Sequence, residues 1–283
     1  MRAAILLVAG LLAPALCGCG SVPPQSDADA RRERQTDLGE RAQRAIGRGE
    51  VGRAAGYYRE ALRIAEATED FPAIGVYALN LAATYQALDE AALAQGALDK
   101  VLAEPARFEQ PLVVEAAGRR ALLALQARQL DTAEEWLGRA ERDCAPASCK
   151  AQVALQNLRG QLLLERGNAA EARAVMVGAL AGARAEGNPE EEANALRVDG
   201  RAAARLGEHG EALAALNRAL DLDKRSGLPR KIALDLIALA EVEIARGERA
   251  AARDYARRAL AVSRAGGSKR QQEEAQRLLE SIP

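Results

Sequence analysis

Residues 206–220, with the sequence LGEHGEALAALNRAL, contain a pattern that recurs along most of the chain. A small residue ends one predicted helix, and an alanine five positions later begins the packed face of the next. A large apolar residue follows four positions on and a small one three after that, so these residues share one stripe of a helix. The equivalent alanines are separated by 40, 39, 39, 40 and 40 residues, and they are Ala54, Ala94, Ala133, Ala172, Ala212 and Ala252. This period indicates a repeat protein built from helix pairs.

Helix-breaking residues fall between the repeats at nearly the same phase. Proline disfavours helix in the residue before it and lacks a backbone donor. Each breaker therefore marks where the second helix of one pair ends and the first helix of the next begins. The breakers are Pro72, Pro105, Pro111, Pro146 and the segments 187–189 (GNP), 227–229 (GLP) and 266–267 (GG).

The repeated positions resemble those of tetratricopeptide repeats (TPRs). Counting from Gln35, Gly75, Val114, Val153, Ala193 and Ala233, position 8 is small and is occupied by Ala42, Ala82, Ala121, Gly160, Gly200 and Ala240. Position 24 is large and apolar in five of the six repeats, as Tyr58, Leu98, Leu137, Met176 and Leu216, with Ala256 in the last. The sequence departs from the family in its longer period, in lacking a tryptophan at position 4, and in Asp89 and Arg128 at position 15, where the family has a turn former such as glycine.

The resemblance implies an all-α fold, a right-handed α-solenoid of six TPR-like helix pairs with a C-terminal capping helix. Each pair leaves an apolar face that only a neighbouring pair covers, so the last pair needs a cap. The expected repeats cover residues 35–266, divided at about 35–74, 75–113, 114–152, 153–192, 193–232 and 233–266. Residues 267–283, polar on most of their surface, are the expected capping helix.

The charges of the chain nearly cancel, giving a formal net charge of −1. This balance gives no reason to expect binding to nucleic acid or to an anionic membrane surface through the overall field. Aromatic residues make up only 3% of the chain. Such a composition, rich in Ala, Leu, Arg and Glu, suits helices that pack through small side chains.

The first twenty residues resemble a bacterial lipoprotein signal. Residues 3–16 form an uncharged apolar run that is too short to span a bilayer as a helix, which needs ~20 residues. The next residues resemble a lipobox, in which residues 1–18 are removed as a signal peptide and Cys19 becomes the lipidated N-terminus. Gly20 then implies a lipid anchor on the periplasmic face of the outer membrane, with residues 19–34 as lipidated N-terminus and flexible tether.

Two other interpretations of this start are open. Cleavage after Ala15 would give an unlipidated periplasmic protein, and an apolar start without an export role is the third possibility. In an exported chain, Cys144 and Cys149 are expected to form a disulfide, because the compartment is oxidising. A redox or metal role for this pair is the alternative, although there is neither a Cys-x-x-Cys motif nor a nearby histidine.

The expected partner-binding surface is the concave face of the solenoid. In the TPR family, positions 2, 5, 9, 12 and 13 of each first helix line this face. They supply an apolar floor here, with Val76, Leu79, Ala83, Leu122 and Leu125, and a polar ridge, with Asn157, Gln161, Asn194, Arg197, Arg201 and Arg205. Such a surface would suit an extended or helical peptide that carries a carboxylate. Alternatively, the arginines pair across the groove with glutamates such as Glu165 and Glu241.

No motif for catalysis, phosphate binding or dinucleotide binding is present. The only histidine, His209, has no positioned partner in the sequence, and adjacent carboxylates on a helix do not face each other. We therefore expect no catalytic residues, no metal site and no cofactor.

The function expected from this resemblance is that of a non-catalytic protein–protein interaction scaffold. It would bind a protein or peptide partner in the concave groove and support assembly of an envelope complex. TPR lipoproteins with this architecture include pilotins for secretin assembly and adaptors for cell-wall hydrolases. Two other classes are a helical-solenoid cell-wall enzyme, which would need a compact domain outside the repeats, and the sensing module of a cytoplasmic regulator.

Overall fold

A computed structural model describes residues 27–144 and 149–282 of the chain. This described part contains α-helices, one short 3₁₀ helix and no strand. The α-helices are α1 (Asp27–Gly47), α2 (Val51–Ala67), α3 (Phe71–Ala87), α4 (Ala91–Leu102), α5 (Gln110–Gln126), α6 (Leu130–Asp143), α7 (Gln152–Glu165), α8 (Ala169–Ala185), α9 (Pro189–Arg205), α10 (His209–Arg225), α11 (Pro229–Arg246), α12 (Arg249–Ala265) and α13 (Lys269–Ser281). The 3₁₀ helix η1 (Pro105–Arg107) lies between α4 and α5.

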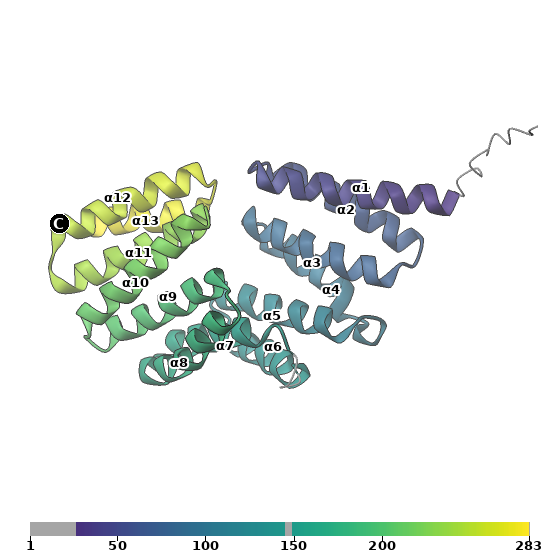
Figure 1. Cartoon of the computed structure of the whole chain (residues 1–283). Helices are drawn as coiled ribbons and strands as arrows, with labels where there is room; N and C mark the ends of the chain where they lie inside the picture. Colours follow the sequence, from purple (N-terminus) through teal and green to yellow (C-terminus); the bar gives the residue numbers. More distant parts are fainter. Residues whose placement is uncertain (1–26, 145–148, 283) are drawn as a thin grey trace, which may run out of the picture.

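The helices pack in consecutive antiparallel pairs, from α1 with α2 to α11 with α12. The pairs follow one another along an arc, so that its two ends, at α1 and α12, face each other again in Figure 1. Helix α13 covers the last pair. Ala275 of α13 is buried in the same cluster as Ala259 of α12, and Ile282, just after α13, is buried beside Ala252 and Ala256. The fold is therefore the all-α solenoid of helix pairs that the repeat pattern predicts.

The repeated small residues lie where helices approach most closely. The six alanines that define the period are all fully buried, as are five of the six residues at position 24, while Tyr58 is almost so. In the fourth and fifth pairs position 8 is glycine because the position 24 side chain fills its space. A Cβ added to Gly160 would lie 2.5 Å from Met176 Cε, and one added to Gly200 would lie 2.7 Å from Leu216 Cγ.

The turn inside each pair needs one residue in the left-handed conformation. Position 15 provides it in all six repeats, with φ between 57° and 88° at Gly49, Asp89, Arg128, Gly167, Gly207 and Gly247. Glycine adopts this conformation without steric cost. Asp89 and Arg128 therefore keep the turn geometry of the other repeats at an energetic cost, which for a non-glycine residue is of order 1 kcal/mol.

The N-terminal boundary differs from the expectation. Helix α1 begins at Asp27, so residues 27–34, expected to belong to a flexible tether, are helical. Asp27 and Asp29 lie in its first turn, where carboxylates favour the helix N-terminus. The expected signal peptide (1–18), Cys19 and the rest of the tether lie outside the described residues. Within the described part, no helix is long and apolar enough to cross a membrane.

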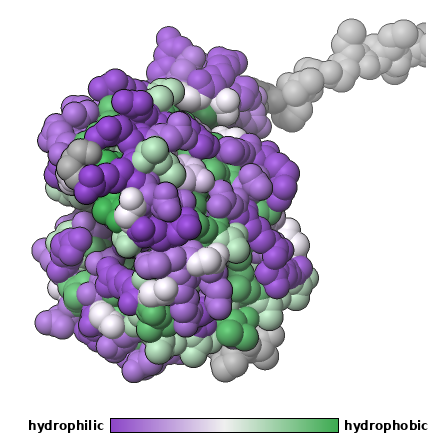
Figure 2. Space-filling view, turned by 90° about the vertical axis from the view of Figure 1, so that its left-hand side faces the viewer, coloured by the Kyte–Doolittle hydropathy of each residue, from purple (hydrophilic) through white to green (hydrophobic). Residues whose placement is uncertain are grey.

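The surface of the solenoid is predominantly polar. Figure 2 shows the side formed by the C-terminal repeats, where hydrophilic side chains predominate and apolar ones are scattered among them. The most exposed large apolar side chain in the described part is Val177 of α8, at 71%. The solenoid surface has two adjacent shallow depressions. Both are lined by Ala170 of α8 and by Leu206 at the end of α9.

Candidate partner-binding surface

The expected apolar floor of the groove belongs largely to the core. Leu79 and Leu125 are buried and Leu122 is half-buried, whereas Val76 is exposed. Leu79 occupies position 5, and every residue at this position is either buried or a glycine: Gly39, Leu79, Gly118, Asn157, Arg197 and Ile237. Position 5 therefore faces the packed interior, and its apolar and small members in the sequence already indicate this.

Two of the expected amides have structural contacts. Asn157 is buried and its Nδ2 donates hydrogen bonds to the Glu191 carbonyl (3.1 Å) and to Glu191 Oε2 (2.7 Å), which ties α7 to α9. Asn194 is half-buried and its Oδ1 accepts hydrogen bonds from Arg197 Nη1 (3.0 Å) and Lys231 Nζ (3.0 Å). Gln161, at position 9, is half-buried and lies on the same helix face as Glu165. Of the three amides, Gln161 is therefore the one best placed to meet a partner.

Arg197 lies in the core instead of on the groove. Only 9% of the residue is exposed, and its guanidinium donates to two carboxylates that are fully buried. Nε donates to Asp235 Oδ1 of α11 at 2.6 Å, and Nη2 donates to Asp223 Oδ2 of α10. Arg197 thus holds three helices together and is not available to a ligand.

Burial also shifts the protonation of these carboxylates. Loss of hydration raises the pKa of Asp235 to about 7, although the charge of Arg197 opposes the shift, and the charge of Asp223 adds to it. Burial likewise raises the pKa of Asp223, again against the charge of Arg197. Asp223 Oδ1 and Asp235 Oδ2 have no hydrogen-bond partner. Arg197 bonds to both acids, and Lys231 acts on Asp223 only through its charge, so a proton retained by the pair near neutral pH would help to balance the charge.

The spacing of the arginines explains why they diverge. Successive residues of a helix are about 100° apart, so a step of four residues rotates the side chain by about 40°. Over the two steps from Arg197 to Arg205 the direction changes by about 80°. The three arginines therefore do not form a single ridge. Arg197 points into the interface with α10 and α11, and Arg201 and Arg205 point toward α7.

Arg201 and Arg205 belong to a group of charges on the inner face, contributed by four helices. Arg201 Nη2 lies 3.3 Å from Glu165 Oε1, and Arg205 Nη1 donates to the Leu164 carbonyl at 2.5 Å. Arg128 Nη1 also approaches Glu165 Oε2, at 3.8 Å. The pairing of Arg201 with Glu165 is the cross-groove contact that the alternative interpretation describes.

Glu241 of α11 completes this group. Its side chain is exposed, yet the surrounding helices reduce its hydration and raise its pKa. The charges of Arg201 and Arg205 oppose the shift, and those of Glu274 and Glu165 add to it. Helices α7, α9, α11 and α13 therefore bring side chains to one region. We call Glu165, Arg201, Arg205, Glu241 and Glu274 the inner charged cluster.

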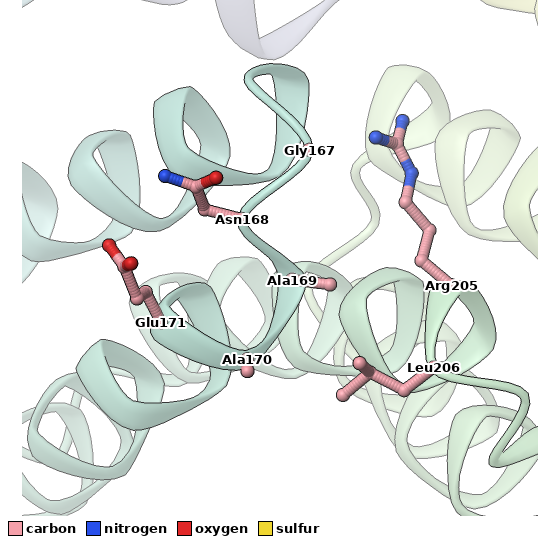
Figure 3. Close-up of a pocket in the computed structure, with 7 residues that line it drawn as sticks. All are labelled: Gly167, Asn168, Ala169, Ala170, Glu171, Arg205 and Leu206. Carbon is pink, nitrogen blue, oxygen red and sulfur yellow. The ribbon is translucent and has the colours of Figure 1, made fainter.

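A depression of about 460 Å³ adjoins this cluster where the turn between α7 and α8 meets the end of α9. Figure 3 shows that Arg205 and Leu206, adjacent in sequence, extend from this helix end in different directions. The Arg205 side chain runs toward the end of α7, consistent with its bond to Leu164, and Leu206 lies beside Ala170 of α8.

The remaining sequence candidates lie away from the cluster. A disulfide joins Cys144, after α6, to Cys149, before α7, with a Cα–Cα distance of 5.4 Å. His209 is half-buried at the start of α10, and its Nδ1 has no hydrogen-bond partner. No group of three or more His, Cys, Asp or Glu side chains in the described residues is arranged to hold a metal ion.

Solved structures with TPR architecture share this fold. The chain is similar to a signal-transduction ATPase with a TPR sensor from Pyrococcus horikoshii, with a TM-score of 0.59 and 16% identity over 90% of the chain, and it spans 37% of that protein's length. It is also similar to the Rap conjugation gene regulator of plasmid pLS20, solved in complex with the Phr* peptide, with a TM-score of 0.64 and 11% identity over 94% of the chain and 80% of the regulator. A third similar structure is pilF of Pseudomonas aeruginosa, with a TM-score of 0.50 and 17% identity over 88% of this chain and 99% of that one.

These likenesses establish the fold. No protein-family model matches the sequence, and no curated protein is significantly similar to it. These three structures are 11–17% identical to this chain, and what they share with it is the stacking of TPR-like helix pairs. The function therefore has to be inferred from the side chains of this chain.

Proposed function

We propose that the protein is a non-catalytic scaffold that binds a segment of a partner protein at the inner charged cluster. The observation that carries this proposal is the convergence of charged side chains from α7, α9, α11 and α13 on one region of the inner face. Guanidinium and carboxylate groups side by side form charge-assisted hydrogen bonds with the backbone and side chains of a peptide. One similar structure, the plasmid pLS20 regulator, is itself in complex with a peptide.

The partner segment proposed for this surface carries both a carboxylate and a basic group. Arg201 and Arg205 would meet the carboxylate, and Glu241 would meet the base. Arg201 already shares Glu165 with Arg128, so a ligand carboxylate competes with a partly exposed ion pair, which costs little to exchange. Gln161 adds an amide on the neighbouring helix.

The site is tested by quantitative capture of partners from envelope extract on the mature chain and on two variants. Arg201→Glu reverses a charge inside the cluster, whereas Arg257→Glu makes the same change on the exposed surface of α12. We expect Arg201→Glu to lose a partner that the parent chain and Arg257→Glu retain, with all three equally stable to heat. Equal capture by all three would exclude the inner charged cluster as the binding site.

The location we propose is the periplasmic face of the outer membrane, with a lipid on Cys19. The apolar run 3–16 and the lipobox-like residues that follow support it. There the scaffold would support assembly of an envelope complex. Mass spectrometry of the N-terminal peptide tests the anchor: a diacylated Cys19 is expected, with release into the soluble fraction on Cys19→Ser. An N-terminus at Leu16 would favour the unlipidated alternative.

A further inference from the structure

The solenoid contacts itself between repeats that are far apart in the sequence. Arg230, in the first turn of α11, donates to the Ala87 carbonyl at 2.5 Å, to the Gln86 carbonyl at 3.4 Å and to Asp89 Oδ1 at 2.8 Å. More than 140 residues separate the two sides. Repeats in a solenoid ordinarily contact only their immediate neighbours, so this contact requires an explanation of its own.

Residues of the α12–α13 turn join the same contact. Ser268 Oγ donates to Asp89 Oδ2 at 3.4 Å, and Gln271 Nε2 donates to the Arg230 carbonyl at 2.7 Å. Ser268 is also the N-cap of α13, where its side chain accepts from the Gln271 backbone N–H. The turn between α3 and α4, inside the second repeat, is therefore tied both to α11 and to the turn before the capping helix. We call Asp89, Arg230, Ser268 and Gln271 the closing contact.

The charges of the closing contact are complementary. Carbonyl groups at the C-terminal end of α3 carry partial negative charge, which favours the guanidinium of Arg230. Burial alone would raise the pKa of Asp89, but the hydrogen bond and charge of Arg230 outweigh it, with a further contribution from Arg270, and the pKa is lowered. The side chains of Arg230 and Asp89 are about a quarter exposed or less, so solvent screens this ion pair only in part.

The residue at the centre of the contact also departs from the repeat pattern. Asp89 occupies position 15, where four of the six repeats have glycine, and keeps a left-handed φ of 59°. A non-glycine residue there costs conformational energy, although aspartate tolerates the conformation better than most residues. In exchange, the second repeat gains the carboxylate that binds Arg230 and Ser268.

We propose that the closing contact is a latch that holds the superhelix shut around the inner charged cluster. Repeats two to six form a ring while the latch is closed, so a partner reaches the cluster only along the superhelix axis. A single extended segment can enter in this way, whereas a folded domain requires the latch to open. The inference about the partner's form rests on the proposed function, whereas the latch itself does not.

The latch is tested without any partner by chemical labelling of an inner cysteine. In the full chain with Cys17 and Cys19 replaced by serine, Gln161→Cys places a thiol on the inner face, and Val177→Cys places one on the outer face. Each is treated with a small maleimide and with a branched polyethylene glycol maleimide. The ratio of the two labelling rates reports whether a bulky molecule reaches the thiol.

Breaking the latch should change this ratio only on the inner face. We expect Arg230→Gln to speed bulky labelling at Gln161→Cys about fivefold or more, because the rate follows the population of the open state. Small-reagent labelling and both rates at Val177→Cys should stay constant. The matched control Arg225→Gln, an exposed arginine near the end of α10, should behave like the parent.

Two results would overturn the latch. One is bulky labelling at Gln161→Cys that is as fast in the parent as in Arg230→Gln, and the other is an equal change in Arg225→Gln. A melting curve of Arg230→Gln tests for global unfolding. Asp89→Asn removes the charge but retains a residue that tolerates the left-handed turn conformation, so it should raise the same ratio of labelling rates. Either outcome is independent of whether a partner binds the cluster, so failure of the latch and failure of the proposed function are distinguishable.

Discussion

The two halves of the solenoid share one backbone repeat but are stabilised differently. From α1 into α7 a single apolar cluster runs through the molecule, and the aromatic side chains Tyr58, Tyr77, Tyr85, Phe71, Phe108 and Trp136 belong to it or pack against it. In the C-terminal half the buried apolar residues fall into several smaller clusters rich in alanine. Buried ionisable groups, Arg197, Asp223, Asp235 and Glu243, lie among these clusters.

This difference shows that the TPR-like pattern fixes where helices approach without fixing what fills the remaining space. Apolar burial stabilises a fold in much the same way at any pH, whereas a buried charge network makes stability depend on protonation. The inner charged cluster belongs to the C-terminal half, which contains the buried ionisable groups, and the latch joins the C-terminal half to the N-terminal half. The following predictions test this division, beginning with the largest effect.

The largest change in unfolding free energy is expected from substitutions at position 5, which is occupied by Leu79 in the N-terminal half and by Arg197 in the C-terminal half. Arg197→Ala would leave Asp223 and Asp235 buried without a cation, which typically costs about 3–5 kcal/mol of unfolding free energy. Leu79→Ala removes a buried apolar side chain at the equivalent position and should cost about 2–5 kcal/mol. Urea unfolding at pH 5 and pH 8 separates them, since only Arg197→Ala should be less destabilising at pH 5. Equal pH dependence of the two variants would contradict the division.

The second prediction concerns overpacking at the repeat alanines. Ala212 is fully buried, so Ala212→Trp, and likewise Ala172→Trp, should destabilise the fold by about 3 kcal/mol or more. The matched control is Ala214→Trp, on the exposed side of the same helix. Thermal unfolding followed by circular dichroism measures both. An unchanged melting temperature for Ala212→Trp would place the repeat in a different register.

The third prediction follows from the raised pKa of Asp235. The folded state holds a proton there up to about pH 7, whereas the ordinary pKa is 3.8, so the folded state binds more protons between these values. Stability should therefore fall as pH rises through about 4 to 7, and Asp235→Asn should remove that part of the fall, which amounts to up to about 4 kcal/mol. Asp221→Asn, on the exposed face of α10, is the control. Parallel pH curves for Asp235→Asn and the parent would refute the assignment.

The fourth prediction tests the close approach at position 8. Gly200→Ala should cost about 1–3 kcal/mol because its Cβ would meet Leu216 Cγ at 2.7 Å. Gly96 of α4 has open space around it, so Gly96→Ala should be neutral or stabilising by up to about 1 kcal/mol through helix propensity. The two variants are compared by chemical denaturation. Equal stability would mean that the C-terminal half tolerates larger side chains than its packing indicates.

The smallest expected effect is at position 15. Arg128 adopts φ 57° and its side chain is 86% exposed, so Arg128→Gly should relieve strain and stabilise the fold by about 1 kcal/mol. Gly207→Ala, at the same position with φ 81°, should destabilise it by a similar amount. Melting temperatures that move in opposite directions would agree with this account of the turn. A loss of stability in Arg128→Gly would show that its contact with Glu165 outweighs the strain.

The sequence predicts the fold because its signal is periodic. The small residues at positions 8 and 20, and the large ones at position 24, act between neighbouring helices, so their spacing alone indicates helix pairs. Position 5 differs from the prediction: the family pattern predicts groove residues there, but Leu79, Asn157 and Arg197 are buried. The partners of Arg197, Asp223 and Asp235, come from two other helices. A family pattern specifies the small and large apolar positions but not the charged residues at the others, so it could not predict this buried ion pair.

Two further features depend on the overall curvature of the solenoid. Arg230 contacts Asp89 only because five helix pairs bring the chain back to its second repeat. Small rotations between successive helix pairs determine whether the second and sixth repeats meet, and these rotations cannot be predicted from any single residue. The start of α1 at Asp27 is a local feature: acidic residues at a helix N-terminus favour it, but the prolines and small residues just before them favour a tether.

The most direct test of the central claim, that a partner segment binds the inner face, is site-specific photo-crosslinking in intact cells. A photoreactive residue replaces Gln161 on the inner face or Val177 on the outer face of the full chain. We expect a defined adduct from Gln161 that disappears with Arg201→Glu and persists with Arg257→Glu, and no such adduct from Val177. An adduct formed only from Val177, or one from Gln161 that Arg201→Glu leaves unchanged, would contradict binding at the inner charged cluster.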